Sequence, residues 1–200
     1  MLITLQNRKL KSKTAGRLVA TILKKNGVIV YPTETLYGFG ALMSSHEAIR
    51  RIVALKKRSD SKPFIFLVKN LDMLSRCGIV TNPMANRLIE HFWPGPLTLI
   101  LKMKNTTCAV RQSSHPFVEE LFEFIDEPLV STSANLSGAD QQAASFDAIR
   151  DLFEPHVDLI IQDDIIPQNT RPSTIVDVSS GCVKMVRDGC ISKQEIEEIV

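Results

Sequence analysis

Residues 129–138 read LVSTSANLSG, and this stretch decides which kind of fold the chain adopts. Its first two residues, Leu129 and Val130, favour a buried strand, whereas the hydroxyl and amide side chains after them favour a loop. Short polar side chains at the end of a strand suit an anionic ligand such as a nucleotide, because the backbone there can approach phosphate oxygens. The stretch therefore predicts a fold of strands and helices that binds an anion where a buried strand ends.

A basic segment further upstream supplies the positive charge that this loop lacks. Residues 55–63 read LKKRSDSKP, in which Lys56, Lys57, Arg58 and Lys62 are cations. Residues 1–70 contain 14 Lys or Arg and 3 acidic residues, whereas residues 71–200 contain 10 basic and 19 acidic residues. Converging cations can neutralise phosphates, although a basic run at a helix end is also typical of a solvated surface.

A third polar segment, YPTETLYGFG at residues 31–40, directly follows a predicted strand. We interpret it as a single turn in which two glycines give the backbone freedom and the hydroxyls of Thr33 and Thr35 hold a polar ligand. It matches neither a Walker A loop nor a GxGxxG motif. Glu34 is read here either as a site residue or as a cap or turn residue.

The rest of the chain alternates predicted helices and strands. Helices are predicted at 15–25, 44–58, 83–91, 116–124 and 146–153 and after Ser192, and strands at 28–31, 64–68, 97–102, 109–111, 159–161, 174–178 and 183–187. Ser44 and Glu47 have the spacing of a capping box. The short connections after residue 155 favour antiparallel pairing. These patterns predict a single α/β (α+β) domain over residues 1–200, in which helices flank a twisted mixed β-sheet around a concave basic cavity.

The composition is that of an ordinary globular protein, with 44% apolar and 23% charged residues and a net charge of +2. The four cysteines show no CxxC spacing, which favours free thiols over disulfides or zinc. No apolar run reaches the roughly 18 residues of a membrane helix, and the N-terminal residues lack a signal-peptide core. We therefore expect a cytoplasmic protein with no membrane partner.

Two further segments contain candidate ligand-binding residues. Arg111 lies on a predicted strand, where a buried cation needs an anionic partner. Residues 169–177, NTRPSTIVD, form a second hydroxyl-rich loop at a strand start, and Arg187 ends the strand that follows. His115, which precedes Pro116, is interpreted as a possible helix cap. No Ser-His-Asp or Cys-His arrangement is evident, so covalent catalysis is not expected.

Taken together, these segments resemble the YrdC family over roughly residues 14–190. The motifs that match in order are YPTETLYGFG, the Lys56-x-Arg58 pair, WPGPLT at 93–98, AVR at 109–111 with His115-Pro116, STSANLSG at 131–138 and PSTIVD at 172–177. The resemblance implies a short, single-domain bacterial threonylcarbamoyl-AMP synthase. Such an enzyme makes the intermediate for N6-threonylcarbamoyladenosine beside the anticodon of tRNAs that read codons beginning with A.

The resemblance also assigns roles to individual residues. Its KxR and SxN pairs correspond to Lys56, Arg58, Ser133 and Asn135, which would form the catalytic and ATP-binding centre. It implies further ATP contacts from Thr107 and Arg187. It implies threonine contacts from Thr33, Thr35, Arg111 and Ser173. This chain departs from the pattern at residues 64–67, FIFL, where some members have a histidine, and after Gly138, where Ser145 is the nearest hydroxyl candidate.

The implied substrates are ATP, L-threonine and bicarbonate, and the implied recipients are the downstream tRNA threonylcarbamoyl transferase proteins. Mg²⁺ would arrive with ATP, since no dedicated carboxylate cluster or organic cofactor motif is evident. The resemblance leaves open whether tRNA itself binds. The alternative is a non-catalytic RNA- or tRNA-binding or ribosome-assembly factor, supported by the basic N-terminal third but by no RNP1 or GXXG signature.

Overall fold

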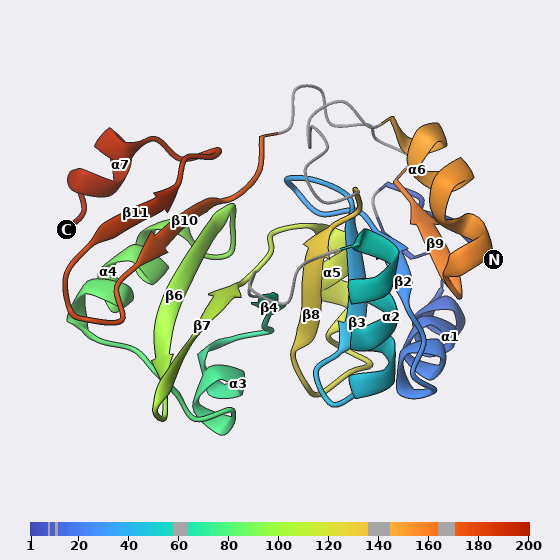
Figure 1. The fold of residues 1–200 in the computed structure, drawn as a ribbon, viewed down its shortest axis with the longest axis horizontal. Coiled ribbons are helices and arrows are strands. Elements are labelled where there is room, and N and C mark those ends of the chain that lie inside the picture. The colour runs from blue at the N-terminus through green and yellow to red at the C-terminus, as the bar shows by residue number, and fades with distance from the viewer. Residues whose placement is uncertain (8, 11, 58–63, 136–144, 164–170) are drawn as a thin grey trace.

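The computed structural model describes residues 1–7, 9–10, 12–57, 64–135, 145–163 and 171–200, which form one mixed sheet with flanking helices (Figure 1). The strands are β1 (Leu2–Thr4), β2 (Ile29–Tyr31), β3 (Gly38–Leu42), β4 (Ile65–Leu67), β5 (Ile79–Val80), β6 (Leu97–Met103), β7 (Thr106–Arg111), β8 (Leu129–Ser133), β9 (Leu159–Gln162), β10 (Thr174–Asp177) and β11 (Lys184–Arg187). The helices are α1 (Lys13–Lys24), α2 (His46–Lys56), α3 (Leu71–Arg76), α4 (Pro83–Phe92), α5 (Pro116–Leu121), α6 (Phe146–Phe153) and α7 (Lys193–Glu197), with a 3₁₀ turn at Glu154–His156. The predicted mixed α/β fold is confirmed.

The strand order across the sheet is β1-β9-β2-β3-β8-β4-β7-β6-β10-β11, and β5 pairs with β6. Three groups of neighbours are parallel, namely β1 with β9 and β9 with β2, β4 with β7, and β6 with β10. The predicted antiparallel pairing after residue 155 is therefore wrong for β9 and correct only for β10 with β11. The two chain ends lie at opposite ends of the sheet (Figure 1).

Successive residues of the central strands point to opposite faces, so each face has its own apolar cluster. Val30 and Phe39 pack with α2 and α6, whereas Ile29 and Tyr31 belong to a larger cluster that includes α1 and α5. In the other half of the sheet, Leu99 faces α3 and α4 with the larger cluster. None of the helices formed by the described residues covers the opposite face of β4, β7, β6 and β10 in Figure 1, and we call this face the open face.

Two local predictions about strands are corrected. β8 continues through the hydroxyls to Ser133, because those residues pair in register with β3 on one side, and Ser131 also pairs with β4 on the other. Residues 31–40 do not form one turn, since Gly38 and Gly40 lie inside β3, where neither has a positive φ. Glycine and serine have low strand propensity, and here neighbouring strands override it.

The start of α2 also differs from the prediction. Ser45, not Ser44, is the N-cap, and its hydroxyl accepts a hydrogen bond from the Ala48 amide. Ser44 instead donates to Glu127. By contrast, Ser192 and Glu195 form the expected capping box of α7. None of the helices within the described residues is long and apolar enough to cross a membrane.

Candidate functional site

A cavity of about 500 Å³ lies over the open face and extends to the loops around β2, β3 and β8. Its apolar wall comes from Ile65, Ile100, Ala109 and Ile175 on four strands of the sheet. Its polar wall contains the predicted site residues Thr33, Thr35, Lys56, Arg111, Ser133, Asn135, Ser173 and Arg187. The fold therefore brings segments that are far apart in the sequence to one place.

At one end of the cavity, the C-terminal turn of α2 meets the loop after β8. The buried Lys56 ammonium donates to the carbonyl oxygen of Ser133, to the carbonyl oxygen of Asn135 at 2.9 Å and to Asn135 Oδ1 at 3.2 Å. Ser133 Oγ donates to the same Oδ1 at 2.6 Å. Lys56 therefore connects the end of α2 to the backbone and the side chain of the loop after β8.

In a second cluster at the cavity, hydrogen bonds to the hydroxyl of Thr33 hold the 33–36 loop. Thr33 Oγ1 accepts from the amides of Thr35 and Leu36 and donates to the Leu36 carbonyl at 2.7 Å. Because its one proton is used there, the 2.9 Å contact with Thr35 is a hydrogen bond that Thr35 donates. Thr35 in turn accepts from Arg111 Nη1 at 2.9 Å. Both hydroxyls thus serve to place Arg111.

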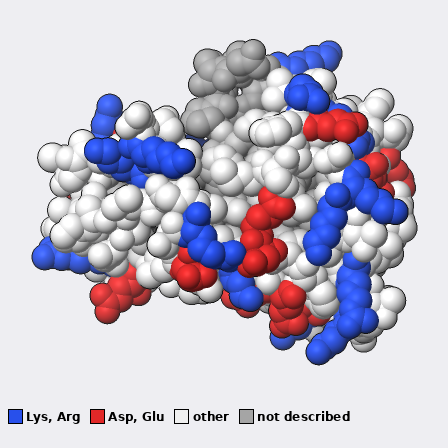
Figure 2. All heavy atoms as spheres, turned by 90° about the horizontal axis from the view of Figure 1, so that it is seen from below, with Lys and Arg blue, Asp and Glu red and all other residues white. Residues whose placement is uncertain are grey.

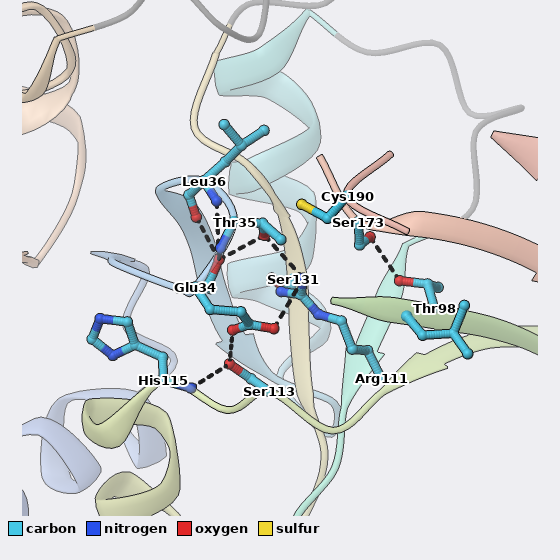
Figure 3. Close-up of polar contacts among 12 residues, drawn as sticks. Glu34, Thr35, Leu36, Thr98, Arg111, Ser113, His115, Ser131, Ser173 and Cys190 are labelled. Atoms are coloured by element: carbon cyan, nitrogen blue, oxygen red, sulfur yellow. Dashed lines mark hydrogen bonds and ion pairs between the residues drawn. The ribbon is translucent and has the colours of Figure 1, made fainter. Parts of the chain in front are cut away.

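Arg111 has a second partner that the sequence did not reveal (Figure 3). Its Nη1 lies 3.5 Å from Glu34 Oε1, and Glu34 Oε2 accepts from Ser113 Oγ. Among the described residues, Glu34 Oε1 and Arg111 Nε are buried without a hydrogen-bond partner. Glu34 is therefore part of the site rather than only a turn residue. At 3.5 Å the pair is longer than a good ion-pair hydrogen bond, so both groups keep capacity to bind a further polar partner.

Ser173, which directly precedes β10, and Arg187, at the end of β11, form a third polar cluster. Arg187 donates to the Ser173 carbonyl from Nε at 3.0 Å and from Nη2 at 2.8 Å, and Nη2 also reaches Ser173 Oγ. Ser173 Oγ lies 2.8 Å from Thr98 Oγ1. Burial lowers the pKa of Arg187, and the positive charge of Arg111 lowers it further. An anion near both guanidinium groups would relieve this repulsion.

Sequence reasoning also missed the buried pair of Tyr31 and Ser131. Tyr31 donates to Ser131 Oγ at 2.8 Å, and Ser131 lines the cavity. A signal was present, because Tyr31 and Ser131 both fall in motifs, but nothing in the sequence linked them.

His115 caps α5, as interpreted, and it has a further role. Its Nδ1 accepts from the Phe117 amide at 3.2 Å, so its proton is on Nε2, 3.0 Å from Asp163 Oδ2. Both side chains are buried. The His115 amide also donates to Ser113 Oγ, which connects this pair to Glu34.

Not every predicted residue lies at the cavity. Thr107 is exposed, lies four residues from Arg111 along β7 and is not among the residues that line the cavity. Arg58 and the segment after Asn135 lie outside the described residues. Ser145, the hydroxyl candidate after Gly138, is the N-cap of α6 and accepts from the Ala148 amide.

Within the part of the chain that the structure describes, no group of three His, Cys, Asp or Glu residues could hold a metal ion. The described cysteines are free, as their spacing indicated. On the face drawn in Figure 2, basic and acidic side chains are interspersed. That face therefore has no continuous basic patch of the kind that tracks a nucleic-acid backbone.

The chain is similar in sequence and in fold to known proteins. The Sua5_yciO_yrdC family model, described as "Telomere recombination", matches residues 21–189. Uncharacterized protein YciO of Escherichia coli (strain K12) is 33% identical over 179 residues, which are 84% of this chain and 85% of YciO. The crystal structure of E. coli YciO has a TM-score of 0.84 with 28% identity and covers 98% of both chains.

A crystal structure of P. abyssi Sua5 complexed with L-threonine is also similar. It has a TM-score of 0.90 and 26% identity, and the match covers 100% of this chain and 61% of the Sua5 chain. The chain thus spans less than two thirds of that Sua5 protein.

Proposed function

Because the chain belongs to the Sua5/YciO/YrdC family, we propose that it is a threonylcarbamoyl-AMP synthase. The reaction joins L-threonine, bicarbonate and ATP and releases pyrophosphate. The product would supply the N6-threonylcarbamoyl group of the adenosine beside the anticodon in tRNAs that read codons beginning with A. Handing it on would require a separate transferase.

The observation that carries this proposal is the state of Arg111. Its guanidinium lines the cavity, is almost fully buried, and has one nitrogen without a partner among the described residues. A guanidinium binds a carboxylate best through two parallel hydrogen bonds. An amino-acid carboxylate in the cavity would give Arg111 the anionic partner that Glu34, at 3.5 Å, supplies poorly. The L-threonine complex of P. abyssi Sua5 supports this choice of ligand.

The Lys56 side of the cavity suits the triphosphate. Lys56, Ser133 and Asn135 line the cavity there, and Arg187 adds a second guanidinium to the same cavity. Cations and hydroxyls of this kind stabilise charge on the phosphates and on departing pyrophosphate. Lys56 would exchange some of its present acceptors for phosphate oxygens as ATP enters.

The chemistry then needs positioning rather than a protein nucleophile. The threonine amine and bicarbonate condense to a carbamate and release water. One carbamate oxygen then attacks the α-phosphorus of ATP as pyrophosphate leaves. Arg111 fixes the amino acid, and the phosphate-binding residues fix the α-phosphorus at reaction distance. Ser131, at the cavity wall between them, offers a hydroxyl to the amino-acid or carbamate oxygens.

Mg²⁺ would be carried by ATP. No group of three His, Cys, Asp or Glu residues among those that the structure describes could hold a metal ion. The proposal therefore assigns the ligation of Mg²⁺ to the phosphate oxygens of ATP.

Pyrophosphate release from ATP by the purified protein, with threonine and bicarbonate each left out in turn, tests the proposal. We expect release only when both are present, together with a labelled threonine–AMP adduct on thin-layer chromatography. The variant Arg111→Ala should lose most of this activity at threonine concentrations below the wild-type KM, whereas Thr107→Ala is the matched control on the same strand and should keep it.

Release that needs neither co-substrate would indicate another nucleotide reaction. No release under any condition, with salt-sensitive binding of tRNA, would replace the synthase with the RNA-binding alternative.

A further inference from the structure

The ring of Tyr31 crosses a neighbouring strand to reach the cavity wall. Tyr31 is on β2 and its partner Ser131 is on β8, with β3 between them. The hydroxyl of Tyr31 nevertheless lies 2.8 Å from Ser131 Oγ. The side chain must therefore lie flat over β3.

Two glycines make this crossing possible. Gly38 pairs with Tyr31, and Gly40 pairs with Ser131, so both lie on the face where the ring runs. A Cβ on Gly40 would lie 2.7 Å from Tyr31 Cε1, closer than real Cβ contacts allow. A Cβ on Gly38 would lie 3.3 Å from Ser131 Oγ. The GFG sequence of β3 thus leaves space for an aromatic ring.

The hydrogen bonds of Tyr31 and Ser131 determine whether the Ser131 hydroxyl donates or accepts toward the cavity. Tyr31 is fully buried, and burial raises the pKa of its hydroxyl above the usual value, so the group stays protonated. The Tyr31 hydroxyl donates its proton in the hydrogen bond to Ser131 Oγ. Among the described residues, the hydroxyl proton of Ser131 itself has no acceptor, and Ser131 lines the cavity. A hydroxyl that already accepts at one side is left to donate at another.

We propose that Tyr31 is a positioning residue, which holds Ser131 as a hydrogen-bond donor toward an anionic oxygen of the amino-acid substrate. This inference rests on the proposed function, since it takes L-threonine as the ligand. The site would then favour a carboxylate or carbamate oxygen at Ser131 and disfavour a donor such as an ammonium group. Tyr31 itself would touch no substrate.

Binding of L-threonine and of ATP, each measured by titration calorimetry, tests this for wild type, Tyr31→Phe, Ser131→Ala and the double variant. Tyr31→Phe keeps the ring and removes only the hydroxyl. We expect it to weaken threonine binding about three- to tenfold, the size of one neutral hydrogen bond, and to leave ATP binding within about twofold. The double variant should bind threonine no more weakly than Ser131→Ala alone, because Tyr31 acts only through Ser131.

Two further variants separate this role from a purely structural one. Gly40→Ala should push the ring away and reproduce the threonine defect of Tyr31→Phe. Phe117→Leu, which loosens packing at the ring 6.1 Å away but leaves both hydroxyls, should lower the melting temperature with near-normal threonine binding.

The outcomes are distinguishable. Normal threonine binding by wild type, with unchanged binding by Tyr31→Phe or additive effects in the double variant, overturns the inference and leaves the proposed function standing. No threonine binding by wild type overturns both.

Discussion

Arg111 carries a positive charge at a position where only 4% of the residue is exposed. Taking such a charge out of water is costly unless it is paired and hydrogen-bonded. Thr35 gives it a neutral acceptor, and Glu34 gives it a charge at 3.5 Å, which is longer than a good ion-pair hydrogen bond. Thr35 and Glu34 thus satisfy only part of the hydrogen-bonding capacity of this guanidinium, so the proposed binding of a carboxylate should depend strongly on Arg111.

Two substitutions at Arg111 separate its charge from its shape. Arg111→Ala should raise the KM for threonine on the order of tenfold to a hundredfold, since a hydrogen bond to a charged group contributes about 1.5–3 kcal/mol. Arg111→Lys keeps the charge but not the planar fork, and it should recover only part of that loss. Steady-state kinetics with each substrate varied gives both KM values. Equal effects on the threonine and ATP constants would show that Arg111 does not select the amino acid.

Cys108 gives a pH dependence that does not involve the site. Burial raises the pKa of its thiol to about 11, from an ordinary value of 9.0. Below pH 9 both folded and unfolded chains keep the proton, and the stability is fully present. Between about pH 9 and 11 the unfolded chain loses the proton first, so stability falls as the pH rises. The urea midpoint should therefore drop more steeply over this range in wild type than in Cys108→Ala. Parallel curves would contradict this assignment.

At the residue scale, single side chains were easier to predict than their partners. Arg111 was identifiable because a charge on a predicted strand needs an anion. Arg111 contacts Glu34, and Glu34 in turn contacts Ser113, which is 79 residues away in the sequence. Tyr31 and Ser131 are 100 residues apart. Composition and spacing predict the type of ligand group that a segment offers. They do not predict which two groups, distant in the sequence, will form hydrogen bonds with each other.

At the scale of elements, the sequence patterns located most helices and strands. They were wrong about the extent of two strands that line the cavity, β3 and β8. β3 reads as a turn because it contains two glycines, yet those glycines lie under the Tyr31 ring inside a five-residue strand. The sequence predicts that β8 ends at Val130, yet its pairing with β3 continues through the serines to Ser133. In both cases the local preference for a loop is outweighed by pairing with neighbours on both sides.

The cap of α2 allows a matched test of an element boundary. Ser45 is buried, accepts from the Ala48 amide and donates to Asn26 Oδ1 at 2.7 Å, whereas Ser44 is exposed and bonds Glu127. Ser45→Ala should lower the free energy of unfolding by about 1–2 kcal/mol, the usual effect of losing an N-cap. Ser44→Ala, at the position that the sequence favoured, should cost less than half as much. Urea unfolding of both variants measures this, and a larger effect at Ser44 would contradict the assignment of the cap.

For the whole molecule, the order of strands decides where the site lies, and the sequence contains little information about it. β8 pairs with β3 and β4, and β10 pairs with β6, although each pair is distant in the chain. These pairings bring loops from one half of the sheet to strands of the other. A general prediction of a mixed sheet with a basic cavity was possible, whereas the open face of β4, β7, β6 and β10 follows only from the arrangement of α3 and α4.

Since the cavity wall includes both halves of the sheet, a bound ligand should stabilise the molecule as one unit. Ligand at one hundred times its dissociation constant adds about 2.7 kcal/mol, which corresponds to roughly 5–10 °C in melting temperature for a chain of this size. Threonine and ATP should each raise the midpoint of a single unfolding transition, and the two together should raise it further. Arg111→Ala should lose the threonine shift and keep the ATP shift, because we propose that its charge binds the amino-acid carboxylate. Two separate transitions, of which only one moves with ligand, would mean that the halves of the sheet unfold independently and that the cavity belongs to one of them.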